Sequence, residues 1–343
     1  MTSISISKAE RSYIQAGVLG NPPSRADTRS LTDFRTISLE TGVAPLANGS
    51  ARLSIGRKPH GGSGGTEILA ATKLEVESIR PGSEGVEGGR VACTVTCSPA
   101  AYSHLSSNAL DDLQYDLTTV ISTTLTHASL HPSNLAILRG KKAWLLNLDL
   151  VVLADAGNVF DALFMAARAA LCDTKVPRTR NVEYKARKGT SSVVGSLAAS
   201  GESWKGDMDL DEEGGSGFDT RSIQQQATDF ELPDYWDEGE PLDGQSRWPI
   251  CVTLNIVPPV HFLDATSQEE AATQARLLLM FAFESEGSTS LQGMRTLGSG
   301  EFTLPQTTDF IKEGEKYAKQ IWNSLNAKLK DEGIAKLKER TKF

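Results

Sequence analysis

The segment LADAGNVFDALFMAARAAL, residues 153–171, joins an apolar strand to an amphipathic helix through a glycine turn. Backbone N–H groups at the start of such a helix form a favourable site for an anion such as phosphate. However, the turn contains no Lys or Arg, and Asp155 and Asp161 flank it. The segment is therefore either a phosphate pocket or a degenerate one. Asn158 is predicted to cap the helix, with Asp161 completing a box-like start.

A second candidate is LDATSQEEA, residues 263–271, where Asp264, Glu269 and Glu270 cluster at a strand-to-helix junction. Carboxylates in such a place can hold Mg²⁺ or act on a proton. A structural role competes with this one, because Ser267 and Glu270 have the S-x-x-E spacing of a helix capping box. We favour the cap.

Two other motifs lack features that a metal site or a phosphate loop requires. His127 and His131 have the spacing of a metal-binding pair, but no HExxH glutamate lies between them and Pro132 ends the helix. The glycine-rich segment GRKPHGGSGG, residues 56–65, lacks the GK[ST] ending and the following helix of a phosphate loop, so a flexible hairpin is expected. We therefore expect no metal and no cofactor.

Composition excludes several classes of protein. The net charge of −8 argues against non-specific binding of nucleic acid by the whole surface. No apolar run approaches the length of a membrane span, and the first residues lack the pattern of a signal peptide. The cysteines form no CxxC pair and are interpreted as buried thiols in a reducing compartment: Cys93, Cys97, Cys172 and Cys251.

The elements that position these residues follow from hydrophobic periodicity. After a helix over 6–18 and a loop over 20–33, we predict an antiparallel meander with strands at FRTISLETG, ARLSIG, EILAATKLEVES and GRVACTVTCS. A helix over about 107–128, a central strand KAWLLNLDLVVLAD and a helix over 158–172 complete the first half.

Residues 175–247 break this pattern, because they are first basic and then acidic and glycine-rich. Residues 185–246 are predicted to be a mostly disordered insertion, whose aromatic residues could anchor its ends or a partner: Trp204, Phe230, Tyr235 and Trp236. We then predict strands at WPICVTLNIV and VHFLDAT, a helix over 268–284, a hairpin at SLQGMRTLGSGEF and a helix over 306–330 whose tail frays. The predicted units are 1–29, 30–174, 175–247, 248–330 and 331–343.

Five segments occur together in an order that resembles a known family: SKAERSYIQAGV, DFRTISLETGVAPLANGSARLSIG, LNLDLVVLADAGNVFDALFMAARAAL, PICVTLNIV and LDATSQEE. They are similar to the RNase PH-type subunits of the eukaryotic RNA exosome core ring, and closest to the ribosomal RNA-processing protein 42 type. The resemblance covers residues 6–174 and 248–325. It implies an α+β, RNase PH-like fold (ribosomal protein S5 domain 2-like) with two similar halves of sheet packed with helices.

The resemblance also implies partners and places. Six RNase PH-type subunits would form a ring, with S1/KH cap subunits above it and RNA threaded through the channel, in the nucleus, the nucleolus and the cytoplasm. Arg80, in the loop 78–89, would touch RNA at the neck of the pore. A solvated loop arginine is the alternative for this residue.

Active members of the family hold phosphate with a Gly-Ser/Thr-Arg turn and use a pair of acidic residues. Here the turn is Gly157, Asn158 and Val159, so an apolar side chain stands at the Arg position. Asp264 matches the first acidic position, but Glu270 stands at the second. The stretch AYSHLSSNALDDL, which matches an RNA-gripping segment, contains no Lys or Arg.

We therefore predict a catalytically silent ring subunit that is not an enzyme and that serves 3′-to-5′ RNA processing and decay, including rRNA maturation. The alternative is an active phosphate-dependent 3′-to-5′ exoribonuclease, whose site a neighbouring subunit would complete. A free RNA-binding monomer is a third, weaker hypothesis.

Overall fold

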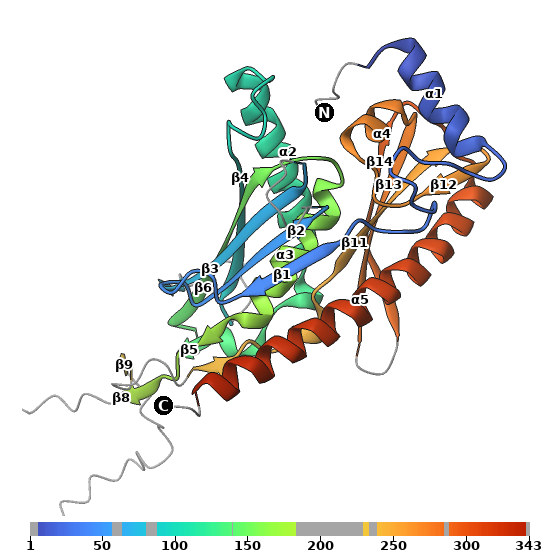
Figure 1. The fold of residues 1–343 in the computed structure, drawn as a ribbon. Helices are drawn as coiled ribbons and strands as arrows, with labels where there is room; N and C mark the ends of the chain where they lie inside the picture. The colour runs from blue at the N-terminus through green and yellow to red at the C-terminus, as the bar shows by residue number, and fades with distance from the viewer. Residues whose placement is uncertain are drawn as a thin grey trace, which may run out of the picture.

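Two large β-sheets, with helices between and beside them, form the main body of the described protein (Figure 1). The computed structural model describes residues 6–56, 64–79, 88–138, 140–182, 229–232, 239–284 and 288–340. The predicted α+β class is confirmed. None of the helices within these ranges has the length and apolar character needed to cross a membrane.

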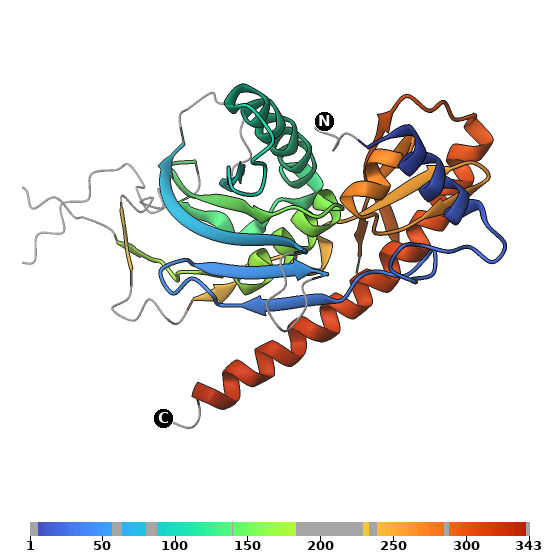
Figure 2. The ribbon, with the colours of Figure 1, turned by 45° about the horizontal axis from the view of Figure 1, so that its top comes forward.

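The first sheet contains β1 (Ile37–Thr41), β2 (Gly49–Ile55), β3 (Thr66–Ser78), β4 (Arg90–Cys97), β5 (Ala136–Leu138) and β6 (Lys142–Ala154). Its order is β1-β2-β3-β6-β4, with β5 paired to β6, and the long strands curve strongly (Figure 2). The predicted antiparallel meander is therefore wrong after β3. β6 lies between β3 and β4, and β4 runs parallel to it. A near-continuous apolar run such as that of β6 belongs in the middle of a sheet, as predicted for it.

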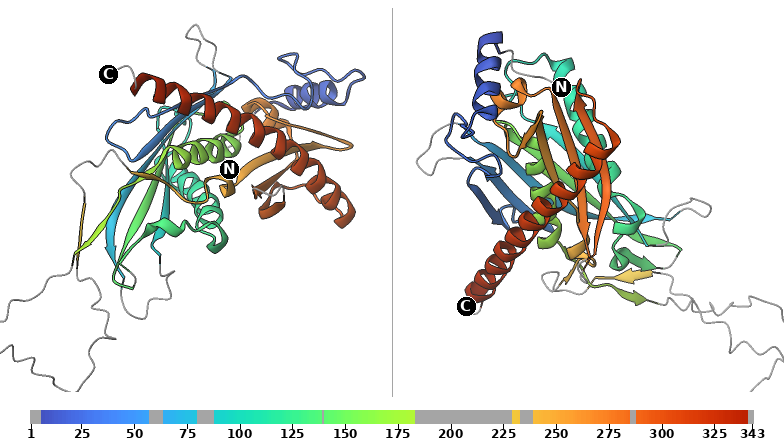
Figure 3. Two further views of the ribbon diagram at one scale, coloured as in Figure 1. Left: turned by 90° about the horizontal axis from the view of Figure 1, so that it is seen from below. Right: turned by 90° about the vertical axis from the view of Figure 1, so that its right-hand side faces the viewer.

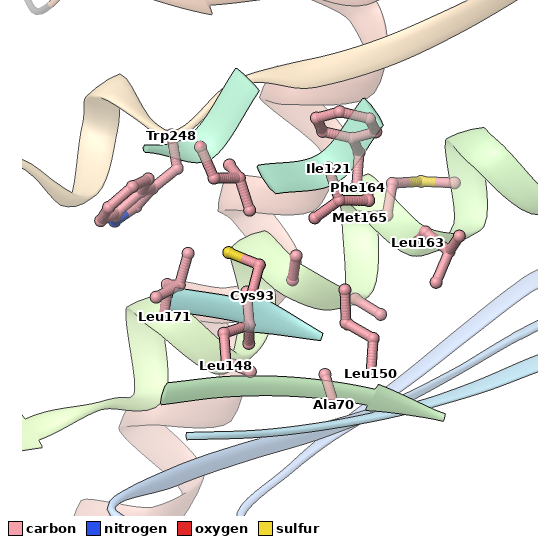
Figure 4. Packing of buried hydrophobic residues seen from close by; sticks show 14 of the residues in the cluster. Ala70, Cys93, Ile121, Leu148, Leu150, Leu163, Phe164, Met165, Leu171 and Trp248 are labelled. Atoms are coloured by element: carbon pink, nitrogen blue, oxygen red, sulfur yellow. The ribbon is translucent and has the colours of Figure 1, made fainter. Parts of the chain in front are cut away.

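Two helices cover this sheet. α2 (Ser107–Leu125) packs on β4, and α3 (Val159–Asp173) packs on β2 and β3. The opposite side of α3 contacts the second sheet, so its side chains are buried all round between Phe160 and Leu171. Leu163, Phe164 and Met165 project from α3 into the core above Leu148 and Leu150 of β6 (Figure 4). The helix that follows the candidate turn is thus the centre of the molecule.

The second sheet is antiparallel, in the order β12-β11-β13-β14. Its strands are β11 (Ile250–Val257), β12 (Val260–Phe262), β13 (Ala275–Phe283) and β14 (Thr289–Gly298). The predicted helix over 268–284 is wrong, because α4 (Ser267–Ala272) ends early and β13 follows it. β13 is buried on both faces, which removes the alternation that marks a half-exposed strand. The predicted hairpin at SLQGMRTLGSGEF is instead mainly β14, which forms a hairpin with β13.

α5 (Leu304–Arg340) crosses beneath both sheets (Figure 3). It extends ten residues beyond the predicted end at 330. Two contacts hold its last turns. Glu332 accepts hydrogen bonds from the N–H and hydroxyl of Thr41, and Lys336 pairs with Asp173 at 2.7 Å. α1 (Lys8–Leu19) packs on α4 and begins with a capping box of Ser7 and Glu10.

Short strands mark the edges of the predicted insertion. β7 (Lys175–Val176) pairs with β10 (Glu240–Pro241), and β8 (Arg180–Val182) pairs with β9 (Asp229–Glu231). Phe230 of β9 packs edge-on against Trp144, so this aromatic does anchor one end. Trp204, Tyr235 and Trp236 lie outside the described residues. Within the described residues, 3₁₀ helices lie at Ala128–Leu130, Ser133–Leu135 and Gln245–Arg247, the last labelled η5.

The predicted free thiols are confirmed. Cys93, Cys97 and Cys251 are buried and Cys172 is partly buried, and none forms a disulfide. Burial raises the pKa of Cys93 to about 12, so its thiol is protonated and unreactive at neutral pH.

Candidate functional site

The glycine turn after β6 lies against the acidic junction between β12 and α4, so the two predicted candidate segments form one site. The N–H of Ser267 donates to the carbonyl of Ala156 at 3.0 Å. Gly157 has a φ of +97°, and a Cβ there would lie 2.5 Å from the carbonyl oxygen of Ala265. Only glycine therefore allows this close approach of the two halves.

The backbone N–H groups of the turn already have anionic partners. Gly157 N donates to Asp155 Oδ1, and Asn158 N donates to Glu270 Oε1, both at 2.8 Å. Glu270 Oε2 also pairs with Arg276 Nη1 at 2.7 Å, and the hydroxyl of Tyr102 donates to Asp155 at 2.7 Å. Two carboxylates of the chain thus stand where the sequence suggested an external anion.

The pKa of Glu270 reflects these surroundings. Burial raises it above the ordinary value, while Arg276 and the N–H of Asn158 oppose the rise and Asp155 adds to it. The neighbouring position 159, where an Arg would face a phosphate, carries Val159. Its side chain packs instead against the first core, the buried cluster that includes Leu148, Phe164 and Leu278. The first residue of α3 therefore supplies no positive charge to the turn.

Asn158 immediately precedes α3, as predicted, but it does not cap the helix through its side chain. Its φ is +61°, and its Nδ2 donates to Asp264 Oδ1 at 3.0 Å, while its Oδ1 has no partner among the described residues. Asp161 does not complete a box-like start either. It is fully buried and accepts hydrogen bonds from the N–H of Thr253 at 3.2 Å and its hydroxyl at 2.7 Å.

Asp264 is buried among arginines. Arg35 reaches it with its backbone N at 2.6 Å, its Nε at 2.9 Å and its Nη2 at 2.7 Å. Arg29 Nη1 donates to the same carboxylate at 2.9 Å. Burial alone would raise the pKa of Asp264, but Arg35 and then Arg29 hold it below its ordinary value.

The predicted capping box has the wrong register by one residue. The side chain of Thr266, not Ser267, caps α4, and Glu269, not Glu270, completes the box. Glu269 also pairs with the buried Arg25 at 2.6 Å. This shift leaves Glu270 free of the cap and aims it at the turn.

Sequence reasoning missed the three arginines that organise the site, Arg25, Arg29 and Arg35, of which two fall in the predicted loop 20–33. Only their alternation with short polar residues could have drawn attention to them, since the site carboxylates that they bind, Glu269 and Asp264, lie more than 200 residues away. Arg29 and Arg35, with Asp155 and Glu269, line a cleft of about 830 Å³. The cleft therefore mixes both signs of charge.

The other predicted candidates do not join this site. His131 Nε2 lies 2.6 Å from the carbonyl of Gly89, and the His127 side chain accepts from Ser129 N–H, so both have structural roles. No cluster of three His, Cys, Asp or Glu residues suited to a metal occurs in the described ranges. Arg80 and most of the segment 56–65 lie outside the described residues.

Residues 33–177, which include the turn and the first sheet, match the model of the 3′ exoribonuclease family, domain 1 (RNase PH). The first half of the chain is therefore similar in sequence to RNase PH-type proteins. Its similar relatives include Exosome complex component Rrp42 of Saccharolobus islandicus, which is 33% identical over 175 residues, 51% of this chain and 60% of the relative. Rrp42 of Methanothermobacter thermautotrophicus is 32% identical over 158 residues, 46% and 55% of the two chains. The match thus spans little more than half of each relative.

Solved structures extend the likeness over nearly the whole chain. One is the Archaeoglobus fulgidus exosome with RNA bound to the active site, with a TM-score of 0.62 at 18% identity, covering 92% of this chain and 97% of that one. Rice Rrp46 has a TM-score of 0.52 at 14% identity, covering 89% and 100%. The predicted RNase PH-like fold and the resemblance to RNase PH-type exosome subunits are confirmed. Membership of a eukaryotic ring stays a prediction.

Proposed function

We propose that this chain is a catalytically silent subunit of an exosome ring. It would help to form the channel through which RNA passes for 3′-to-5′ processing and decay, including rRNA maturation. Its partners would be other RNase PH-type subunits in a six-membered ring and S1/KH cap subunits, in the nucleus, nucleolus and cytoplasm. The similar exosome components and the RNase PH-like fold support the assembly.

One observation carries the proposed silence: Glu270 occupies the N–H group of Asn158 at the start of α3. A phosphate arriving at the turn would have to displace this carboxylate and would then lie beside Asp155. Like charges at such a distance repel, and no arginine at position 159 offsets the repulsion. The site therefore disfavours the co-substrate of phosphorolysis.

The state of Asp264 supports the same proposal. Both of its oxygens accept hydrogen bonds, from Arg29, Arg35 and Asn158. A carboxylate whose pKa is lowered by two arginines is a weak base and has few free lone pairs for a metal ion. Asp264 in this chain acts as the anchor of the arginine loop.

The test is phosphate-dependent RNA shortening by a ring assembled with this chain. Asp264→Asn keeps the shape of the side chain and should leave the rate within about twofold of wild type, as should the control Asp309→Asn on the exposed face of α5. Size-exclusion chromatography establishes that each ring is intact. A loss of tenfold or more in an intact Asp264→Asn ring would contradict silence.

That result would favour the alternative, an active phosphate-dependent 3′-to-5′ exoribonuclease whose site a neighbour completes. The free-monomer hypothesis is tested by the mass of the purified chain alone and with RNase PH-type partners. A chain that stays monomeric in the presence of those partners would contradict the proposed assembly.

A further inference from the structure

A second cavity lies away from the turn and is lined by residues of α5, of the C-terminal half of α3 and of η5. Its volume is about 440 Å³. Three basic side chains line it, Arg168, Lys330 and Lys336, against a single carboxylate, Asp173, among the described lining residues. The cavity therefore carries an excess of positive charge.

Arg168 is the unusual member of this set, because it is a buried cation without a carboxylate. Only 1% of its surface is exposed. Its Nη1 donates to the carbonyls of Ser246 and Trp248, its Nη2 donates to Asn326 Oδ1 at 2.9 Å, and Trp322 packs on the guanidinium at 5.7 Å. Within the described ranges no acidic side chain pairs with it, and its Nε has no acceptor.

Such an arrangement leaves free energy to be gained by binding an anion. A buried charge is stable only when other groups compensate it, and carbonyl dipoles do so less completely than a counter-ion. In agreement, burial lowers the pKa of Arg168 from its ordinary value. The cavity that Arg168 helps to line gives a counter-ion a place beside the guanidinium.

The other two cations differ in their availability. Lys336 is neutralised by Asp173 Oδ1 at 2.7 Å, and the second oxygen of Asp173 accepts the N–H of Ser50 at 3.1 Å. Lys330 is exposed and forms no ion pair with any described residue. The Asn326 side chain accepts from Arg168 through Oδ1, which leaves its amide N–H groups as donors.

We infer that this cavity binds a small oxyanion, a phosphate or a carboxylate group, between Lys330 and the Asn326 amide in the field of Arg168. The charge of Arg168 selects for an anion, and Lys330 supplies the mobile contact at the mouth of the cavity. The inference concerns the back of α3 and does not depend on the silence of the turn at its front.

The test is calorimetric titration of the full chain with sodium phosphate and, separately, sodium acetate, at constant ionic strength set with sodium chloride. Wild type should bind at least one of the two saturably, and the one that binds identifies the group. Lys330→Ala should weaken that binding about tenfold, the effect of losing one charge-assisted contact. Lys319→Ala removes the same charge from the same helix outside this cavity and should leave binding within about twofold.

Two outcomes would overturn the inference. The first is that the wild-type chain gives no saturable heat with either anion up to the solubility limit of the salt. The second is an equal loss in Lys330→Ala and Lys319→Ala, which would indicate general charge screening. Because Lys330 is exposed, its variant is expected to fold, and circular dichroism verifies this.

Discussion

At the scale of single residues, the carboxylates of Glu270 and Asp264 hold parts of the fold together. Each carboxylate joins segments that are distant in the sequence: Glu270 joins the turn to Arg276 of β13, and Asp264 joins it to the loop with Arg29 and Arg35. Charge-assisted hydrogen bonds of this kind are stronger than neutral ones. The residues that resemble catalytic groups are therefore the ones that hold the two halves together.

Gly157→Ala tests the close contact of the halves at the turn. The added Cβ would meet the backbone at Ala265 and Thr266, and the φ of +97° is strained for alanine. We expect the free energy of unfolding to fall by about 3 kcal/mol or more, measured by urea denaturation. The control Gly140→Ala also has a positive φ, +69°, but meets no atom within 4 Å. It should cost only about 1 kcal/mol, and equal losses would contradict the contact.

Asp161 should make stability depend on pH. Burial raises its pKa to about 7. Between about pH 4 and pH 7 the native state therefore holds a proton that the unfolded chain has released, so stability falls as the pH rises, by at most about 1.4 kcal/mol per pH unit. The contribution is fully present below pH 4 and lost above pH 7.

Asp161→Asn, which does not titrate, isolates this effect. The difference in free energy of unfolding, wild type minus variant, should decrease from about pH 4 to pH 7 and then stay level. Comparison of the two proteins cancels other titrating groups, including Glu270. Parallel stability curves over this range would show that Asp161 keeps an ordinary pKa.

At the scale of elements, hydrophobic periodicity predicted β3 and β4 correctly but predicted a helix in place of β13. The strands β3 and β4 alternate apolar and polar residues because one face of the sheet is less buried, and they were predicted with nearly correct bounds. The run ARLLLMFAF contacts the first core on one face and α5 on the other. Leu, Met and Ala favour helices in isolation, but here tertiary packing overrides that preference.

Leu278→Ala tests the double burial of β13. Leu278 is fully buried in the first core although it belongs to the second sheet. Its truncation should lower the free energy of unfolding by about 2–5 kcal/mol, the range for a leucine whose cavity collapses only partly. Leu291→Ala, at an exposed position of β14, should change it by less than about 1 kcal/mol. A small effect of Leu278→Ala in urea denaturation would contradict the packing.

At the scale of the whole molecule, the two halves meet in the largest hydrophobic cluster, the first core. Trp248, Ile250 and Leu278 from the second half belong to the same buried cluster as β6 and α3. The candidate site could be predicted only in part. The strand–turn–helix segment and the acidic junction each have a local sequence pattern. Their meeting, and the arrival of Arg25, Arg29 and Arg35 from the N-terminal loop, depend on long-range packing that periodicity cannot encode.

Removal of α5 should therefore unfold both halves together. A chain that ends at residue 303 loses Leu325 from the first core. It also loses Tyr317 and Ala318 from the second core, the buried cluster that includes Leu277 and Leu279. We expect it to aggregate or to elute without a compact peak in size-exclusion chromatography. A chain that ends at residue 340 keeps these contacts and should stay compact. A shortened chain with a cooperative urea transition would contradict the shared core.

The length and place of α5 also bear on how the protein is made. The helix is 37 residues long, roughly 55 Å, and follows every other described element along the chain. Translation adds roughly 5–20 residues per second. One face of the second sheet, with Leu277, Leu279 and Phe281, therefore stays exposed for several seconds before α5 is synthesised and packs on it. We therefore expect the nascent chain, rather than the finished protein, to bind chaperones, and slowing of translation before residue 304 should prolong that binding.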